Sequence, residues 1–236
     1  MFTAKSHRDL GEIYDQLAPD YDRLHRRWLK RAGGEAQAAL EATVRALATP
    51  ITSLLDVGCG TGVFARALIA EGMSPLQMTL LDPSDAMLAH CADIPVRQVK
   101  GRLEALPFED GEFDIVTCAW ALETVPHPEM ALKELCRAVR HGGVLCLAFC
   151  AETPARNMTD WLSCQAINWR GTGRFLSREH VIEFLRASGE FEVRVVPSHG
   201  PAAALLARRL SKLGATRPET PDTLSSGSET TKGLLP

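Results

Sequence analysis

Short apolar runs alternate with segments of helical pattern between residues 51 and 150, and this alternation restricts the fold more than any other feature of the chain. Short links between the two kinds of segment are typical of a parallel sheet with helices on both faces. Runs that are apolar throughout, such as VLCLAF, fit strands covered on both sides. Because parallel neighbours connect by right-handed crossovers, the sequence predicts an α/β fold with a doubly wound sheet. The predicted strands are residues 51–58, 77–82, 95–101, 112–120 and 144–150.

Two further strands are predicted beyond this unit, which brings the mostly parallel sheet to seven strands. The segments Val193–Val196 and Ala202–Leu206 have the spacing of an antiparallel hairpin at the sheet edge. At the other end, residues 1–50 show a helical pattern that is expected to break near Pro19 and near Gly33–Gly34. These residues are predicted to form an N-terminal helical cap.

The chain therefore divides into three predicted parts. The cap covers residues 1–50, and the α/β domain covers residues 51–213. Within that domain, residues 151–176 follow the fifth predicted strand and are expected to form a lid over the substrate. Residues 214–236 are rich in Pro, Ser, Thr and Gly and poor in core residues, so we expect a disordered tail.

Composition excludes several classes of protein. The formal charge of −3 gives no support for a nucleic-acid partner, which normally requires a basic excess. No apolar run approaches the ~18 residues of a membrane span, and the N-terminus lacks the apolar core of a secretory signal. The seven cysteines form no CxxC pair, so no metal site and no disulfide framework is expected. These features predict reduced thiols and a cytoplasmic location.

The glycine-rich stretch LLDVGCGTG follows the first predicted strand, at the edge of the sheet where such folds bind ligands. Gly58, Gly60 and Gly62 allow positive φ angles and a close approach of a ligand to the backbone. The next helix begins directly after them, and its free N–H groups suit a carboxylate or a phosphate. Val63 stands where a dinucleotide fingerprint requires its third glycine, and no GxxxxGK[ST] phosphate loop is present.

Two carboxylates narrow the choice of ligand. Asp82 ends the second predicted strand, about 20 residues after the glycine turn, where a carboxylate accepts hydrogen bonds from ribose hydroxyls. Asp56 lies inside the apolar first strand, which is costly unless a cation or hydrogen-bond donors pair with it. A ligand that carries adenosine, an α-ammonium and an α-carboxylate meets all these requirements, and S-adenosylmethionine is such a ligand.

Four motifs in this order give the chain a family resemblance: LLDVGCGTG, LLDPSDAML, GRLEALPFEDGEFDIV and RAVRHGGVL. Together they resemble the class I S-adenosylmethionine-dependent methyltransferases, which have a Rossmann-like fold, and in particular the quinone-biosynthesis C-methyltransferases. The N-terminal YDQLAPDYD is similar to the cap helix that closes over the cofactor in that family. The resemblance extends from about Ile13 to Leu210.

The resemblance implies a role for each matching position. Gly58 and Gly60 would line the methionyl part of the cofactor, and Asp56 would support the loop or the ammonium. Asp82 would bind the ribose. Arg102 departs from the family, which often has Asp or Asn there, so either the Leu103 backbone alone contacts the adenine or Glu104 takes part. The remaining implied cofactor contacts are Tyr21 as a cover, Met87 on the adenine, and the backbone around Cys118–Trp120, including Ala119.

Glu123 and His127 lie just after the fourth predicted strand, where a methyl acceptor should arrive. Either side chain would serve as a general base if the acceptor is poorly ionised. Glu123 is also consistent with a packing or helix-start carboxylate, and His127 with an N-cap or a surface residue before Pro128. In the predicted lid, Trp161, Trp169 and Phe175 would suit a flat or apolar acceptor, and Arg170 or Arg174 an anionic one.

Three functions remain open from the sequence. The first is methyl transfer from S-adenosylmethionine to a small acceptor that is aromatic, quinone-like or lipid-like. The second is a protein of the same fold that uses the cofactor for other chemistry or binds it without turnover. The third, an NAD-dependent oxidoreductase, is disfavoured by Val63 and by the absence of a Tyr/Lys pair. The basic stretch RLHRRWLKR indicates a solvated helix face or peripheral contact with an anionic membrane, and the oligomeric state is not predicted.

Overall fold

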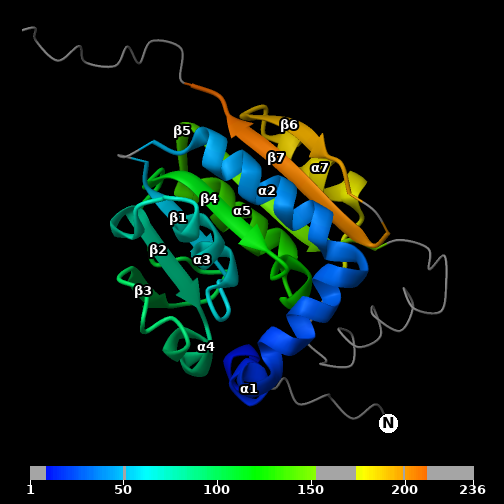
Figure 1. Ribbon diagram of the computed structural model, residues 1–236. Helices are drawn as coiled ribbons and strands as arrows, with labels where there is room; N and C mark the ends of the chain where they lie inside the picture. Colours follow the sequence, from blue (N-terminus) through cyan, green and yellow to red (C-terminus); the bar gives the residue numbers. More distant parts are fainter. Residues whose placement is uncertain (1–8, 50–51, 153–173, 199, 212–236) are drawn as a thin grey trace, which may run out of the picture.

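The computed structural model describes residues 9–49, 52–152, 174–198 and 200–211 (Figure 1). The predicted tail and most of the predicted lid, with Trp161, Trp169 and Arg170, lie outside the described residues. The helices are α1 (Leu10–Trp28), the π-helix η1 (Leu29–Gly33), α2 (Gly34–Leu47), α3 (Val63–Ala70), η2 (Pro75–Gln77), α4 (Asp85–Ala89), η3 (Leu122–Thr124), α5 (Pro128–Ala138) and α7 (Arg178–Ala187). The strands are β1 (Leu54–Val57), β2 (Met78–Asp82), β3 (Arg97–Lys100), β4 (Phe113–Ala119), β5 (Val139–Cys150), β6 (Phe191–Val196) and β7 (Ala202–Arg209).

The strands form one seven-stranded sheet in the order β3-β2-β1-β4-β5-β7-β6. All neighbours from β3 to β5 are parallel, whereas β7 is antiparallel to both β5 and β6. The chain order reverses between β1 and β4, so the carboxyl ends of these strands flank a switch point of the sheet. The predicted mostly parallel, doubly wound sheet with a terminal hairpin is confirmed.

Alternating side chains of the central strands enter two hydrophobic cores on opposite faces of the sheet. Leu55, Leu81 and Val116 belong to the core that α5 and α7 cover. Their neighbours Leu54, Leu80 and Ile115 pack in the core that α2 and α3 cover. Figure 1 shows α2 lying across the latter face of the sheet. Two-sided burial explains why these strands are apolar at nearly every position.

The N-terminal helix is longer than predicted. α1 runs from Leu10 to Trp28 without a break at Pro19. Proline inside a helix removes a backbone hydrogen bond and is unfavourable, but the hydrogen bonds of Asp15 and Asp22 to neighbouring elements hold α1 in place. Near Gly33–Gly34 the regular helix is interrupted as predicted, but the chain stays helical there, because a π-helical turn that ends at Gly33 joins α1 to α2. The result is one continuous helical segment that crosses the carboxyl ends of the strands and then returns along the sheet.

The boundary between α5 and β5 also differs from the prediction. The fifth strand was predicted to begin at Val144, but α5 ends at Ala138 and β5 begins at Val139. The Arg209 guanidinium donates to the carbonyl oxygens of Val139 and Cys136 at 2.6 and 3.3 Å, which satisfies acceptors at the helix end. The strand pairing then shifts its register between Phe113 and Ile115.

Among the described residues, no helix is both long and apolar enough to cross a membrane. The same residues hold no cluster of three or more His, Cys, Asp or Glu side chains arranged to bind a metal ion.

Candidate functional site

The glycine turn after β1 adopts the backbone conformation that the sequence requires. Gly58, Gly60 and Gly62 have φ values of 70°, 55° and 76°, a region that side chains rarely adopt. A Cβ atom on Gly58 would lie 2.4 Å from Cβ of Ala121, and one on Gly60 would lie 3.3 Å from Cε1 of Tyr21. The turn therefore needs glycine both for its conformation and for the space beside it.

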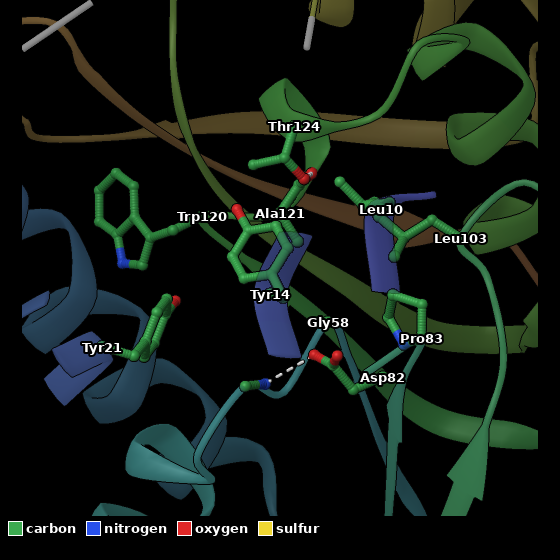
Figure 2. Close-up of a pocket in the computed structure, with 11 residues that line it drawn as sticks. Leu10, Tyr14, Tyr21, Gly58, Asp82, Pro83, Leu103, Trp120, Ala121 and Thr124 are labelled. Atoms are coloured by element: carbon green, nitrogen blue, oxygen red, sulfur yellow. Dashed lines mark hydrogen bonds between the residues drawn. The ribbon is translucent and has the colours of Figure 1, made fainter. Parts of the chain in front are cut away.

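Asp82 holds this turn against the end of β2. Its carboxylate accepts a hydrogen bond from the Gly60 N–H at 2.9 Å (Figure 2). It accepts another from the Ser84 N–H at 2.9 Å. Burial raises the pKa of Asp82 to about 6, although both hydrogen bonds oppose that shift. Each carboxylate oxygen retains a second acceptor site for a ligand hydroxyl. Asp82 thus has a structural role in the turn and also faces a pocket.

Asp56 lies within β1 and is 2% exposed. One carboxylate oxygen accepts a hydrogen bond from the Thr117 hydroxyl at 2.7 Å. The other oxygen, Oδ2, is buried and has no hydrogen-bond partner among the described residues. Burial raises the pKa of Asp56 to about 6, and the nearby Asp82 carboxylate contributes to this rise. A buried acceptor without a partner is costly, so the arrangement suits a cationic ligand group.

Two adjoining pockets open over the carboxyl ends of β1, β2 and β4, and they share Tyr21, Gly58 and Trp120. The first is lined by Leu10, Tyr14, Tyr21, Gly58, Gly60, Asp82, Pro83, Leu103, Trp120, Ala121 and Thr124 (Figure 2). The second is lined by Tyr21, His25, Gln37, Asp56, Gly58, Cys59, Thr61, Val63, Phe64, Ala119 and Trp120. The first pocket is the more apolar of the two in its lining residues, and the second contains Asp56.

α1 covers both pockets and is fastened to the sheet by two carboxylates. Asp15 accepts hydrogen bonds from the Ser84 hydroxyl at 2.5 Å and from the Ala86 N–H at 3.0 Å, at the start of α4. The hydrogen bond from the Ser84 hydroxyl is the main cause that lowers the pKa of the Asp15 carboxyl, and the hydrogen bond from the Ala86 N–H adds to it. Asp22 accepts a hydrogen bond from the Thr61 hydroxyl of the glycine turn at 2.5 Å. The cap helix is therefore attached on both sides of the site.

Trp120 has an unusual backbone conformation directly after β4. Its φ is 62°, and it is the one non-glycine residue with positive φ in the described part of the chain. For a bulky side chain this conformation costs about 1–3 kcal/mol and persists only where the surroundings impose it. The Trp120 N–H donates to the Ala148 carbonyl of β5 at 2.7 Å, and its indole N–H donates to Gln37 at 3.0 Å.

His25 and Gln37 were not recognised as site residues from the sequence, although both line the second pocket. His25 stacks on Tyr21 with a ring-centroid distance of 5.7 Å and an interplanar angle of 9°. Burial lowers the pKa of His25, and a hydrogen bond with Gln37 opposes this effect. The i, i+4 spacing of Tyr21 and His25 on α1 was a usable signal. No sequence signal indicated Gln37, because it contacts Trp120 from 83 residues away in the chain.

Several predicted cofactor contacts lie at the two pockets. Tyr21, Asp56, Gly58, Gly60, Asp82, Leu103 and Ala119 all line one or both of them. Two others do not line either pocket. Met87 is fully buried in α4, and Arg102 is exposed, with its guanidinium 3.3 Å from Asp9. The predicted roles of Met87 and Arg102 at the adenine therefore receive no support from their positions.

The two predicted catalytic residues also lie outside the lining of both pockets. Glu123 is 3% exposed within η3, one residue from the pocket-lining Thr124. Burial is the main cause that raises the pKa of the Cys118 thiol, and the nearby Glu123 charge adds to this rise. His127 is exposed and precedes α5 without a side-chain hydrogen bond to the helix end. Their catalytic roles stay predictions.

The comparisons with known proteins identify the class to which this fold and site correspond. Residues 55–147 match the model of the methyltransferase domain family. This region contains the glycine turn, Asp56 and Asp82, and it extends through most of β5. Residues 55–147 are therefore similar to a methyltransferase domain.

Particular relatives make the resemblance more specific. The chain is 35% identical over 156 residues to a ubiquinone/menaquinone biosynthesis C-methyltransferase of Methylobacterium nodulans, which is 59% of each chain. It is 32% identical over 157 residues to a demethylmenaquinone methyltransferase of Lactiplantibacillus plantarum, which is 60% of this chain and 61% of the relative. The match thus spans about three fifths of the length of these relatives.

A solved structure supports the fold. An S-adenosylmethionine-dependent methyltransferase of Thermotoga maritima superposes with a TM-score of 0.63 at 22% identity. The superposition covers 85% of this chain and 100% of that one. At this identity the likeness concerns the fold alone.

Proposed function

We propose that the protein transfers a methyl group from S-adenosylmethionine to a small acceptor with a quinone-like ring. The observation that carries this proposal is the meeting of two pockets at Tyr21, Gly58 and Trp120, over the switch point of the sheet. The names of the similar proteins, which refer to ubiquinone, menaquinone and demethylmenaquinone, support the choice of acceptor.

The site residues fit the cofactor on two grounds. The Asp56 Oδ2 atom, without a hydrogen-bond partner among the described residues, suits an ammonium group. The glycine turn leaves space beside Tyr21 and Ala121 that a Cβ would fill, so the backbone is open to a ligand there. In this proposal Asp82 holds the ribose hydroxyls and Leu103 lies against the adenine. When bound, the cofactor supplies a sulfonium methyl group that is already strongly electrophilic.

The protein's part in the reaction is then mainly positional. α1 and Trp120 cover the junction of the two pockets and exclude water from it. The Gly58 N–H donates to the Leu81 carbonyl at 2.7 Å, which fixes the turn on which the ligand rests. Holding two reactants in line supplies a large part of such a rate enhancement. A proton acceptor would still be needed for a weakly acidic acceptor, and Glu123 and His127 remain the proposed candidates.

The experiment is to incubate the protein with S-adenosylmethionine and 1,4-naphthoquinol without oxygen and to measure S-adenosylhomocysteine and methylated naphthoquinol by mass spectrometry. We expect both products in equal amounts. Formation of neither product, while S-adenosylhomocysteine binds, would favour the alternative of a cofactor-binding protein without methyl transfer. Stabilisation by NAD instead of S-adenosylhomocysteine would contradict the proposal.

A paired substitution tests the cofactor site itself. Asp82→Asn removes the charge that would hold the ribose, and hydrogen bonds to a charged group contribute about 1.5–3 kcal/mol each. We expect the dissociation constant of S-adenosylhomocysteine to rise at least about tenfold, measured by calorimetry. The matched control is Asp93→Asn, since Asp93 is an exposed carboxylate that pairs with Arg66 away from the pockets. An unchanged affinity of Asp82→Asn would argue against ribose binding at this residue.

Cellular location and partners belong to the same proposal. A cytoplasmic location is supported by the cysteines of the described residues, which are all free thiols and mostly buried. We propose no nucleic-acid partner. If the protein contacts a membrane surface, the exposed basic residues of α1 would make that contact.

A further inference from the structure

Two cysteines from different parts of the chain meet at the glycine turn. Cys59 lies inside the turn, and Cys91 follows the short helix α4. Both sulfur atoms approach the carbonyl oxygen of Gly60, at 3.7 Å from Cys59 and 3.6 Å from Cys91. The two thiols also form a hydrogen bond with each other. A disulfide forms when one sulfur attacks another, so two thiols in contact are a candidate pair.

Close packing holds Cys91 beside the turn. Cys91 is fully buried, and a Cβ atom on Gly62 would lie 2.9 Å from its sulfur. On the other side, the Gln98 side chain donates to the Cys91 carbonyl oxygen at 2.9 Å, which fixes the backbone. The two sulfur atoms are therefore kept together by the fold and do not depend on a chance encounter.

The hydrogen bond between the thiols makes it easier to remove one proton from the pair. This bond is the main cause that lowers the pKa of Cys91, and it is also the main cause that raises the pKa of Cys59. The pair therefore loses its first proton readily and shares the second between the two sulfur atoms. Either sulfur can then carry the negative charge that a nucleophilic thiolate needs.

The second pocket gives a small molecule access to this pair. Cys59 lines that pocket together with Asp56, the carboxylate that suits the ammonium group of the cofactor. Cys59 is 9% exposed, whereas Cys91 lines neither pocket. Hydrogen peroxide is little larger than water and can reach the Cys59 sulfur from the pocket. A bound cofactor would cover Cys59 and block this approach.

We propose that Cys59 and Cys91 form a site of oxidative modification, at which hydrogen peroxide converts the two thiols into a disulfide and thereby weakens cofactor binding. The Cys59 thiolate attacks one peroxide oxygen, the O–O bond breaks, and the departing hydroxide takes the Cys91 proton to become water. The Cys91 thiolate then attacks the Cys59 sulfur of the sulfenic acid. The S–S bond forms, the S–O bond breaks, and the hydroxide released takes a proton from solvent. Two thiols and one peroxide thus give one disulfide and two waters.

The disulfide would displace the turn that holds the cofactor. An S–S bond is about 2.0 Å long, much shorter than a contact between two thiols, so Cys59 and Cys91 must move towards each other. Gly60 lies beside both, and its N–H is held by Asp82 at 2.9 Å. Gly60 also lies against the ring of Tyr21. A shift of Gly60 disturbs both contacts. The effect on the cofactor rests on the proposed function, whereas formation of the disulfide does not.

The test treats the reduced protein with hydrogen peroxide, alkylates the remaining thiols and maps disulfides by peptide mass spectrometry. We expect a linked Cys59–Cys91 peptide pair. Saturation with sinefungin, a cofactor analogue without sulfur, should slow its formation at least about tenfold. After removal of the peroxide, calorimetry should show a dissociation constant for S-adenosylhomocysteine that is at least about tenfold higher than in the reduced protein. Dithiothreitol should restore the original affinity.

Substitution of Cys91 separates the disulfide from other effects of peroxide. Cys91→Ala removes one thiol of the pair, and the reduced variant should bind S-adenosylhomocysteine as the wild type does. Its affinity should not change after peroxide treatment. Cys91→Ser serves the same purpose if alanine destabilises the region after α4. The matched control is Cys136→Ala, because Cys136 is a more exposed thiol in α5 that lines neither pocket, and this variant should respond as the wild type does.

The two proposals fail in distinguishable ways. Oxidised protein without a Cys59–Cys91 link would overturn the inference, as would linked protein that binds S-adenosylhomocysteine as tightly as the reduced protein. A reduced protein that does not bind S-adenosylhomocysteine would contradict the proposed function. In that case the peptide map alone decides whether the two cysteines form an oxidation site.

Discussion

At the scale of single residues, Asp56 and Asp82 give the site a pH dependence. Burial is the largest cause that raises the pKa of each carboxyl, in both cases to about 6. A protonated carboxyl has no charge with which to hold an ammonium group, so ligand binding favours the ionised form.

We therefore predict that S-adenosylhomocysteine binds more tightly as the pH rises from 5 to 7 and that its affinity levels off above about 7. Each group that must lose a proton contributes up to about a tenfold change per pH unit below its pKa. Titration calorimetry at several pH values measures this dependence. Asp56→Asn should bind more weakly and show a shallower slope, and an unchanged slope in that variant would assign the titration to another group.

Gly58 provides a second prediction at this scale. Gly58→Ala adds a Cβ in a left-handed conformation and in collision with Ala121, so we expect a loss of about 2–4 kcal/mol in the free energy of unfolding. Gly72→Ala is a matched control, because Gly72 has φ 99° and no atom within 4 Å of the added Cβ. Urea denaturation should show the smaller loss for Gly72→Ala, and adding Ala121→Gly to Gly58→Ala should restore part of the difference.

The residues that sequence reasoning found and missed differ in how they reach the site. Asp56, Gly58 and Asp82 are placed by the strand ends that carry them, so their positions followed once the strands were recognised. Gln37 was missed, because it meets the Trp120 indole through tertiary packing of α2 that no local pattern encodes. A positive φ at a tryptophan also contradicts local preference, and such conflicts are typical of functional sites.

At the scale of secondary-structure elements, α1 is held over the pockets by Asp15 and Asp22. We predict that Asp15→Ala weakens S-adenosylhomocysteine binding by about 3- to 10-fold, since a hydrogen bond to a charged group contributes about 1.5–3 kcal/mol and part of it is recovered by water. Hydrogen exchange of α1 should become faster, while exchange in the sheet stays unchanged. Asp20→Ala is the control, because Asp20 is exposed and pairs only with Arg23 among the described residues. Equal exchange in both variants would contradict this role.

The elements also show which parts of the fold a sequence can predict. The sheet followed from apolar strands and their spacing, because burial on both faces leaves a strong pattern. The uninterrupted α1 did not, since Pro19 is a helix breaker by propensity and the contacts with α4 and the glycine turn override that preference. The start of β5 was also mispredicted, because the Arg209 side chain that meets the end of α5 lies some 70 residues further along the chain.

At the scale of the whole molecule, β7 connects the edge strand β6 to the rest of the sheet. It pairs with β5 on one side and β6 on the other, so a chain without it would lose two ladders at once. We predict that removal of residues 201–236 prevents folding, whereas removal of residues 214–236 leaves the melting temperature and the S-adenosylhomocysteine affinity unchanged. Thermal unfolding followed by circular dichroism compares the two truncations. A large loss of stability in the shorter truncation would show that the tail contributes to the fold.

Tyr21 belongs to the lining of both pockets and is carried by the helix that covers them. Departure of a ligand from either pocket therefore requires the same part of α1 to move. Under the proposed function, S-adenosylmethionine enters and S-adenosylhomocysteine leaves through this one opening, so the movement of α1 controls their exchange. We expect turnover at saturating substrate to be limited by the opening of α1, so that added viscogen slows the protein even though the chemical step is unaffected.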